Sequence, residues 1–314
     1  MLSTLQVLKD RAANVALKTF ADSPAINGSW HVHLEELSRV NIKWPATYQW
    51  ESAGIWVDGL TREFRRRVKV DFVELTQPYR GIVIFQFANE RGTHDVAIDY
   101  SDYPEINSEC ASRCSLYFKM QHRREGYGYA NVVPGGYVCD SRKIYLHLPR
   151  LRRLRDQQDF AFDVYGRFST EFARDIRKRA IGILSNQTRF RFEGGLRKVK
   201  LLDFLREVAR ARICIDLPGE GDLCFRLINY LAVGACIVGP RPRTTLHVPL
   251  QDRIHVAYVR DDLSDLVETC RYYLENDEAR EEMRVRSREF FDRYLHNDNL
   301  AAYYLRTCLD RLSN

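Results

Sequence analysis

The stretch "DLPGEGDLCFRLINYLAVGACIVGP", residues 216–240, decides how the chain folds. It leaves an apolar strand through a turn that holds two glycines and two acids, enters a helical pattern, and ends in a second apolar strand. Such a succession predicts a βαβ unit, in which the two strands lie parallel in one sheet. It also raises a question, because Arg226 falls within the first turn or so of the predicted helix, where the helix dipole disfavours a cation.

The same alternation of strands and helices runs through the chain from about residue 160 onward. Its strands are rich in Ile, Val and Cys and lack clean alternation, which is typical of a parallel sheet buried on both faces. The predicted strands are 160–166, 188–195, 211–218, 235–240 and 255–259. The predicted helices are 169–185, 198–210, 223–234, 262–277 and 277–295. This half is therefore predicted to be a doubly wound α/β domain.

The first half of the chain is less regular and predicts a second, smaller α/β domain. Pro- and Gly-bearing turns separate its strand candidates, which are 30–37, 67–75, 81–88, 95–100 and 114–121. The segment "VVPGGYVCDSRK" (132–143) has the composition of a linker. We therefore expect an N-terminal domain over 1–138, a C-terminal domain over 139–296 and a final helix over 297–314. Two such domains form a cleft, with ligands beyond the carboxyl ends of the strands.

Composition favours a soluble intracellular protein. Residues 1–30 lack the apolar core of a signal peptide and are not apolar enough to span a bilayer. The net charge of +6 is concentrated in "REFRRR" (62–67) and "RLRRLR" (150–155). Such runs suit a polyanionic partner or a nucleotide phosphate, although most charge runs are only solvated faces.

The eight cysteines are scattered, and no CxxC pair occurs. Several lie in apolar runs, so we expect buried free thiols. Cys110 and Cys114 with His122 nearby are the one cluster that could suggest a metal, and it lacks a fourth ligand.

The turn at 219–221 is a candidate anion site. Gly219 and Gly221 allow the backbone to turn sharply and to bring amide N–H groups close to an anion at a helix N-terminus. A bound diphosphate would then also compensate the charge of Arg226. The alternative is that Glu220 or Asp222 pairs with Arg226 and that no ligand is involved.

These residues carry a resemblance to the donor-binding half of GT-B glycosyltransferases of the "group 1", capsule-type family. The family pattern is G-x(4)-R-x-x-E followed by a small-residue turn and an apolar strand. In this chain it is matched by Gly221, by Arg226 and by the turn at Gly234. Asn229 stands where the family has an acid that binds ribose, and an amide can also bond a hydroxyl. The paired glutamates of many retaining members are missing, because Ile228 stands eight residues after Glu220.

The resemblance implies a GT-B-like fold, with two Rossmann-like domains facing a cleft and a C-terminal helix that crosses back to the N-terminal domain. It also implies a hexosyltransferase-like enzyme with a nucleotide-sugar donor, a UDP- or GDP-sugar, and no obligatory cofactor or metal. The residues expected to hold the donor diphosphate are Arg226, Gly219, Gly221, Glu220, Arg167 and Lys198, and Asn229 is expected to bind the nucleoside. Arg167 follows the strand and glycine turn of "DVYGRF", while Lys198 follows "FEGG".

An inverting transfer would also need a base that takes the acceptor proton. The stretch "ERGTHDVAIDYSDYPEIN" (90–107) offers Asp102, Asp99 and His94 beside an apolar strand. Close to the linker, Lys119, His122 and Arg123 are candidates for contact with the acceptor or the phosphates.

Two classes of function therefore stay open. The first is a metal-independent glycosyltransferase whose acceptor is a carbohydrate, a small molecule or a nucleic acid, with modified DNA as the polyanionic variant. The second is a non-catalytic nucleotide or nucleic-acid binding module that retains the fold. A dinucleotide-dependent oxidoreductase is disfavoured, because no G-x-G-x-x-G follows an early strand.

Overall fold

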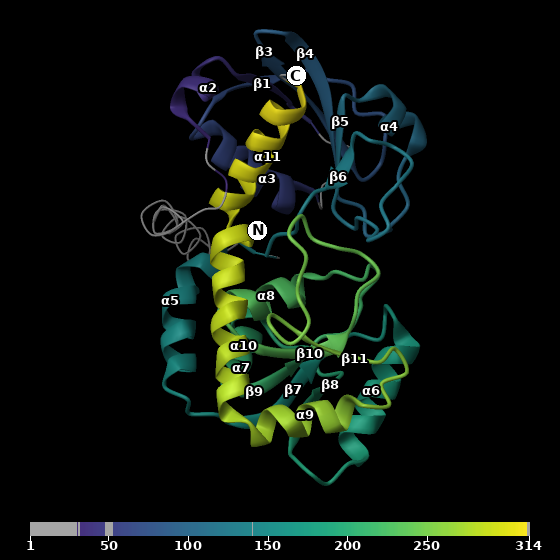
Figure 1. Ribbon diagram of the computed structural model, residues 1–314, viewed down its shortest axis with the longest axis vertical. Helices are drawn as coiled ribbons and strands as arrows, with labels where there is room; N and C mark the ends of the chain where they lie inside the picture. Colours follow the sequence, from purple (N-terminus) through teal and green to yellow (C-terminus); the bar gives the residue numbers. More distant parts are fainter. Residues whose placement is uncertain (1–29, 31, 48–52, 140, 313–314) are drawn as a thin grey trace, which may run out of the picture.

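The computed structural model describes residue 30 and residues 32–47, 53–139 and 141–312. Nearly all of the stretch 1–30, where the sequence argues against a signal peptide, lies outside the described residues. Two domains follow one another along the long axis of the molecule, and the last helices, residues 277–312, run in succession beside the C-terminal and then the N-terminal domain (Figure 1). No helix in the described part of the chain has the length and hydropathy needed to cross a bilayer.

The N-terminal domain is built on a six-stranded mixed sheet in the order β2-β1-β3-β4-β5-β6. The strands are β1 (Asn41–Pro45), β2 (Lys69–Val73), β3 (Ile82–Asn89), β4 (Gly92–Asp99), β5 (Leu116–Lys119) and β6 (Val132–Pro134). Strand β3 runs antiparallel to its neighbours β1 and β4, whereas β4, β5 and β6 are parallel to one another. The carboxyl ends of β4, β5 and β6 therefore lie at the same edge of the sheet.

Helices complete this domain and correct one prediction. They are α2 (Leu34–Ser38), α3 (Ala53–Arg65) and α4 (Ser108–Arg113). The predicted strand 30–37 is wrong, because Leu34–Ser38 is helical and the backbone N–H of His33 donates to Glu36 Oε2 over 3.1 Å. That contact satisfies one of the amides left open at a helix start, which alternating hydrophobicity does not report.

The C-terminal domain has a five-stranded, fully parallel sheet in the order β11-β10-β9-β7-β8. The strands are β7 (Phe162–Arg167), β8 (Phe192–Gly195), β9 (Ala211–Ile215), β10 (Cys236–Pro240) and β11 (Ala257–Val259). The helices are α5 (Lys143–Asp156), α6 (Arg174–Asn186), α7 (Leu201–Ala209), α8 (Phe225–Val233), α9 (Leu266–Glu275) and α10 (Asp277–Phe290). The predicted doubly wound α/β domain is confirmed.

The strand order of this sheet locates the place where a ligand is expected. In chain order the strands run 2-1-3-4-5, so the winding reverses between β7 and β9. A crevice opens at such a switch point, beyond the carboxyl ends of the strands that flank it. The segments that follow β7 and β9 therefore frame the candidate site.

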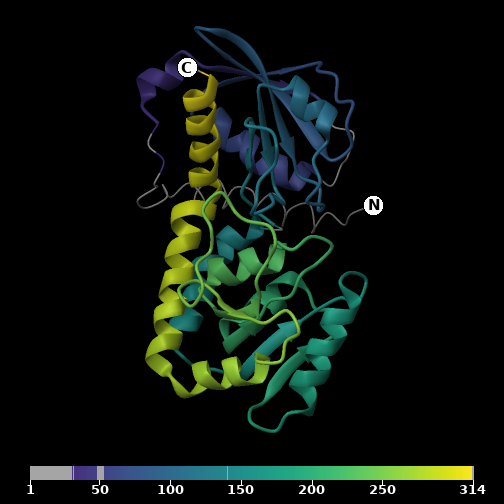
Figure 2. The same cartoon turned by 45° about the vertical axis from the view of Figure 1, so that its right-hand side comes forward.

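The C-terminal helix crosses back to the N-terminal domain, as predicted (Figure 2). A short π-helical segment, η1 (Phe291–Leu295), leads into α11 (Asn297–Leu312), which packs against α3 and β5. Tyr303 and Tyr304 donate their hydroxyls to the carbonyls of Pro134 and Gly135 over 2.6 and 2.7 Å. The helix is thus bonded to the segment that joins the two domains.

A short polar seam connects the domains. Gln121 Nε2 donates to Leu223 O over 2.8 Å, and the Leu223 N–H donates back to Gln121 Oε1 over 3.1 Å. Next to it, Thr245 N–H donates to His122 O over 2.8 Å. Gly221 faces this seam, and a Cβ there would lie 2.5 Å from Asp102 O. A glycine is needed at 221 because the two domains approach one another so closely.

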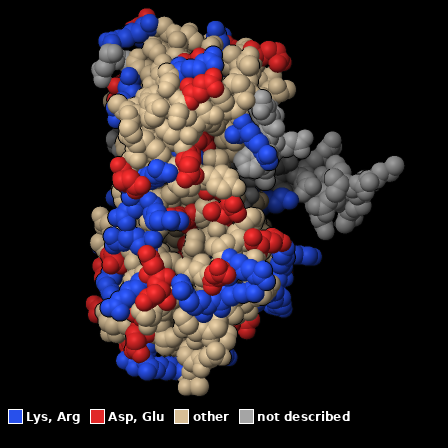
Figure 3. All heavy atoms as spheres, turned by 90° about the vertical axis from the view of Figure 1, so that its right-hand side faces the viewer, with Lys and Arg blue, Asp and Glu red and all other residues tan. Residues whose placement is uncertain are grey.

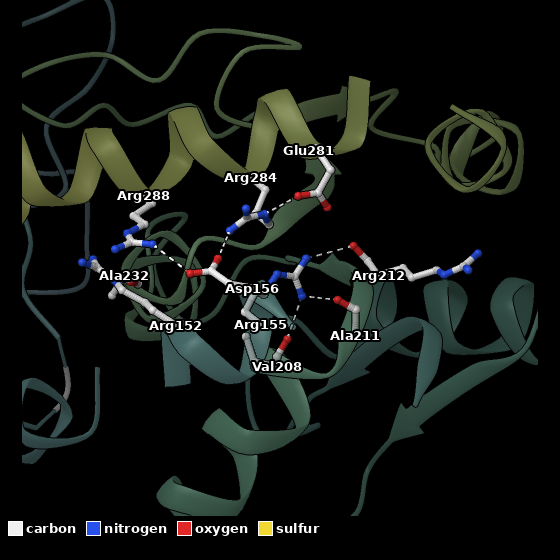
Figure 4. A network of polar contacts seen from close by, with 10 residues as sticks. All are labelled: Arg152, Arg155, Asp156, Val208, Ala211, Arg212, Ala232, Glu281, Arg284 and Arg288. Carbon is white, nitrogen blue, oxygen red and sulfur yellow. Dashed lines mark hydrogen bonds and ion pairs between the residues drawn. The ribbon is translucent and has the colours of Figure 1, made fainter. Parts of the chain in front are cut away.

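The arginine run 150–155 belongs to α5 and is used inside the protein (Figure 4). Arg155 is fully buried and donates to the carbonyls of Val208, Ala211 and Arg212. Arg152 forms a two-bond pair with Asp292, at 3.0 and 2.6 Å. Two arginines of this run therefore face the interior, whereas Arg150 and Arg153 are exposed.

The run 62–67 is also engaged with neighbouring acids. Arg62 pairs with Asp58 at 2.6 Å, Arg66 with Glu63 at 3.2 Å, and Arg67 with Asp298. All eight cysteines are free thiols, and seven are buried. Cys110 and Cys114 lie 3.8 Å apart, sulfur to sulfur.

Candidate functional site

A cavity of about 350 Å³ opens at the carboxyl ends of β7 and β8 and at the start of α8. We refer to it as the cationic cavity, because its wall contains Arg167, Arg197, Lys198 and Arg226. None of the described residues that line it is an Asp or a Glu. Four positive charges without an acid among the lining residues make this a candidate site for an anion.

Arg226 lies in the first turn of α8, and its charge is compensated by Asp216. The guanidinium Nε donates to Asp216 Oδ1 over 3.1 Å, and Nη2 donates to the carbonyl of Leu217. Only 12% of the side chain is exposed, and the guanidinium lies 4.9 Å from the ring centre of Phe168. The partner is therefore neither Glu220 nor Asp222 but the residue that follows β9.

The Asp216–Arg226 pair lies at the N-terminus of α8, where the helix dipole disfavours a cation that has no anionic partner. Burial raises the pKa of Asp216, and the charge of Arg226 acts against the rise. A carboxylate beside the N-terminus of a helix is stabilised by the dipole that disfavours the arginine. The question raised by the sequence thus has an answer within the protein, while the guanidinium still lines the cationic cavity.

Arg167 is held by glutamates that lie behind the cavity wall. Its Nε donates to Glu207 Oε2 over 2.6 Å, and its Nη2 donates to Glu193 Oε1 over 3.0 Å. The hydroxyl of Tyr165 donates to the same Glu207 oxygen over 2.8 Å. These bonds fix the orientation of the guanidinium before any ligand is present.

Arg197 and Lys198 are the two accessible cations of the wall. Their side chains are 68% and 79% exposed. Arg197 lies 3.4 Å from Glu207, and Lys198 lies 3.2 Å from Glu171. Exposed pairs of this kind contribute little and exchange readily, so both cations can turn toward a ligand.

Aromatic rings form the rest of the wall. Phe168, Phe204 and Phe225 line the cavity together with the buried amide side chain of Asn229. Phe225 is 37% exposed and meets the ring of Tyr137 edge-on at 5.1 Å. Flat apolar rings next to cations suit a ligand that combines a planar heterocycle with phosphates.

The predicted glycine turn does not line the cationic cavity. The N–H of Gly219 donates to Gly221 O over 2.8 Å, so this amide is used within the turn. Gly221 faces the domain seam, and Glu220 is an exposed acid. The expectation that this turn cradles an anion with its amides is therefore corrected for Gly219 and Gly221.

The sequence reasoning missed Arg177, which ties the two loops of the switch point together. It projects from α6 and is buried, and its Nε and Nη1 donate to Pro218 O and Ser169 O over 2.9 and 2.5 Å. Arg174, Lys178 and Arg179 stand beside it in the sequence. Nothing in that run distinguishes the one residue that turns inward.

Among the candidate bases, Asp102 lies between the domains. Burial raises its pKa, and the nearby charge of Glu220 raises it further. The negative charge of Asp102 also contributes to the raised pKa of Tyr137, whose ring contacts Phe225 of the cavity wall. Asp102 itself is not among the residues that line the cationic cavity.

The contacts of Asp99 do not favour its predicted role as a base. It is buried at the end of β4, and its carboxylate pairs with Lys119 Nζ at 2.9 Å. It also accepts hydrogen bonds from the hydroxyls of Tyr117 and Ser101 over 2.5 and 2.7 Å. Lys119 is itself fully buried, so the expectation that it contacts a substrate is corrected as well.

The other N-terminal candidates lie elsewhere. His94 is in the first half of β4, five residues from Asp99, and the hairpin that carries it points away from the C-terminal domain (Figure 1). The structure therefore does not bring His94, predicted as a base, to the cationic cavity. His122 is buried in the seam, where burial lowers its pKa, and Arg123 pairs with Glu105 at 3.2 Å.

The fold and the cationic cavity define a two-domain α/β protein with a candidate anion site at the switch point of its C-terminal sheet. A glycosyl transferase-like family model matches residues 147–306, just over half of the chain, and the protein belongs to that family. Its two facing α/β domains and returning C-terminal helix agree with the GT-B-like arrangement expected from the resemblance.

One solved structure, the crystal structure of a glycosyltransferase from Rickettsia africae ESF-5, is similar at 15% identity with a TM-score of 0.33. The match covers 54% of this chain and 45% of that one, so the chain spans less than half of that protein's length. A likeness this distant carries no argument for the site. No curated protein matches the chain.

Proposed function

We propose that this protein is a glycosyltransferase that moves a sugar from a nucleotide diphosphate to an acceptor hydroxyl. The observation that carries the proposal is the cationic cavity, which places four cations and no acid in its wall at the switch point. Membership of the glycosyl transferase-like family supports the reaction class.

In this proposal the donor lies along the wall of the cationic cavity. Arg226, Arg197 and Lys198 contact the diphosphate, with Arg167 behind them. A nucleobase stacks on the phenylalanine rings, and the amide of Asn229 bonds a ribose hydroxyl. A UDP- or GDP-sugar fits this division into an apolar and a cationic part.

Transfer requires that the negative charge developing on the leaving diphosphate be stabilised. Fixed guanidinium groups do this well, because they are oriented before the reaction begins. We therefore propose that no metal is obligatory, and that activity persists when divalent cations are chelated.

Asp102 is the proposed base. It would accept the proton of the acceptor hydroxyl while the sugar–phosphate bond breaks and the new glycosidic bond forms. Its raised pKa increases its strength as a base, and it lies beside Gly221 at the seam between the two domains.

The test combines binding with turnover in the full chain. We expect UDP or GDP to raise the thermal unfolding midpoint, and the matching nucleotide sugar to be hydrolysed slowly or transferred. Asp102→Asn should lower turnover at least about a hundredfold with nucleotide binding unchanged. Glu105→Gln, on the same loop, is the matched control. Binding without hydrolysis or transfer would favour the non-catalytic module instead.

A polyanionic acceptor such as modified DNA is the sharper form of the proposal. Its support is the net charge of +6 and the Lys and Arg side chains that gather over the lower, C-terminal half of the face in Figure 3. If DNA is the acceptor, its binding should weaken steeply with salt concentration.

A further inference from the structure

A second cavity lies on the other side of the Asp216–Arg226 pair. It measures about 240 Å³ and opens at the carboxyl ends of β9, β10 and β11. Asp216 belongs to its wall, Arg226 belongs to the wall of the cationic cavity, and the two cavities share no lining residue. The ion pair is therefore a partition between two separate spaces.

This second space, the apolar cavity, is lined mainly by hydrophobic side chains. They include Ile176, Leu217, Leu227, Leu250, Val256 and Tyr258. Of its acids, Asp216 is paired with Arg226, and Asp222 accepts the Arg243 N–H over 2.6 Å. Asp261 is exposed at the mouth. The interior thus suits an apolar group about the size of a single ring.

A third cavity of about 230 Å³ adjoins the apolar cavity and is more polar. The two share Arg241, Pro242, Leu250 and Tyr258. This polar cavity adds Arg124, which the N-terminal domain contributes across the seam. Its one lining acid, Asp252, already accepts the Tyr258 N–H over 2.9 Å.

Two cations at this junction have no carboxylate partner. The guanidinium of Arg241 lies 4.8 Å from the ring centre of Tyr258. Burial raises the pKa of Tyr258 to about 12, and the charges of Arg241 and Arg124 act against that rise, so both cations are near. In the part of the chain that the structure describes, neither arginine forms an ion pair, in contrast to Arg226 and Arg243.

We propose that the apolar and polar cavities together form a second ligand site, which takes an amphipathic anion. An aromatic or short aliphatic body occupies the apolar cavity, and a carboxylate or phosphate group lies between Arg241 and Arg124. Binding itself does not depend on the proposed function. A coupling of this site to the sugar donor would act through the Asp216–Arg226 pair, which separates the apolar cavity from the cationic cavity. Only that coupling rests on the proposed function.

Three probes with the same body and different charge test the proposal. They are phenylacetate, phenethylammonium and phenethyl alcohol, each titrated onto the full chain and followed by saturation-transfer NMR. Phenylacetate should bind saturably and about tenfold more tightly than phenethylammonium, because a charge-assisted contact to a guanidinium is available only to the anion.

Matched variants locate the site. Arg241→Gln should remove most of the preference for phenylacetate, whereas Arg260→Gln, an exposed arginine that lines neither cavity, should keep it. Leu250→Trp fills the space shared by both cavities and should abolish binding of all three probes. Ile254→Trp, an exposed position in the same loop that lines neither cavity, is its control.

The outcomes separate this site from the cationic cavity. The proposal would be overturned if phenylacetate does not bind saturably, if the three probes bind with equal affinity, or if phenethylammonium binds best. It would also be overturned if Arg241→Gln keeps the preference for phenylacetate unchanged. UDP and GDP are titrated onto the same samples. Nucleotide binding without phenylacetate binding would overturn the second site alone, and phenylacetate binding without nucleotide binding would leave it standing while the proposed function fails.

Discussion

Helix α5 and the cationic cavity are both rich in cations, yet they use them in opposite ways. On α5, Arg155 donates to three carbonyls (Figure 4). Arg152 pairs with Asp292, so both charges face the interior. In the cationic cavity, the acids that pair with Arg167 and Arg226 lie behind the wall, and the lining itself contains no acid.

The difference teaches that a run of arginines in a sequence does not mark a polyanion site. In the run 150–155, which has four arginines and two leucines, Arg152 and Arg155 brace α5 from the inside, whereas four cations spread between residues 167 and 226 line one cavity. Whether an arginine can contribute to a ligand site depends on its position relative to the carboxyl ends of the strands.

The largest effect is expected on the α5 side of the comparison. Arg155→Ala would remove a buried guanidinium that donates to three carbonyls and would open a void, and should lower the free energy of unfolding by about 3–5 kcal/mol. Urea denaturation measures it. Arg153→Ala, at an exposed position on the same helix, is the control and should stay within about 0.5 kcal/mol of the parent. A mild effect of Arg155→Ala would show that α5 does not depend on this brace.

On the cavity side, Arg226→Ala should affect stability and binding together. It leaves Asp216 half-buried without its partner, which should cost about 3 kcal/mol. It also removes a charge-assisted phosphate contact, so the nucleotide dissociation constant should rise at least about tenfold. Adding Asp216→Asn should restore most of the stability but not the binding. Restored binding in the double variant would contradict the phosphate role of Arg226.

A buried histidine that stays neutral is a third case, beside the paired arginines of α5 and those of the cationic cavity. His247 is enclosed next to Tyr303, at a ring distance of 4.3 Å, and burial lowers its pKa to about 3. Because the unfolded chain takes up the proton near pH 6.5 and the folded chain does not, stability should fall as the pH falls below that value. His247→Phe should remove about 1 kcal/mol of the loss between pH 6 and 5. Parallel pH profiles of the two proteins would disprove this.

The smallest effect is expected for the run 62–67. Arg62 and Arg66 form exposed pairs within α3 or at its end, and such pairs contribute about 0.5 kcal/mol or less. Arg62→Ala with Arg66→Ala should therefore leave the unfolding midpoint and nucleotide binding nearly unchanged. A marked loss of DNA binding in this variant would instead restore the run as part of a polyanion surface.

Much of the fold could be predicted from the sequence. The parallel strands of the C-terminal sheet are continuous apolar runs, and periodicity detects these directly. The failure at 30–37 has a local cause, since Glu36 accepts the His33 N–H in a helix start. Helix α5 went unpredicted because its Pro149 and its arginines resemble a solvated segment, whereas tertiary contacts stabilise it.

The candidate site was only partly accessible to such reasoning. Arg167, Lys198, Arg226 and Asn229 line one cavity, as the resemblance implied they would share a site. Their partners could not be predicted, because Glu207 is 40 residues from Arg167 and spacing carries no signal over that range. The ion pair of Asp99 could not be predicted for a similar reason, since its partner Lys119 comes from the neighbouring strand β5.

The central claim is that the cationic cavity binds a nucleotide diphosphate, and calorimetric titration with UDP and GDP at fixed salt tests it most directly. The parent should bind one of them, and Arg197→Ala with Lys198→Ala should bind it at least about tenfold more weakly. Arg189→Ala with Arg271→Ala removes two similarly exposed cations, both paired with Glu268, and should bind like the parent. No binding to the parent, or equal losses in both double variants, would contradict the claim.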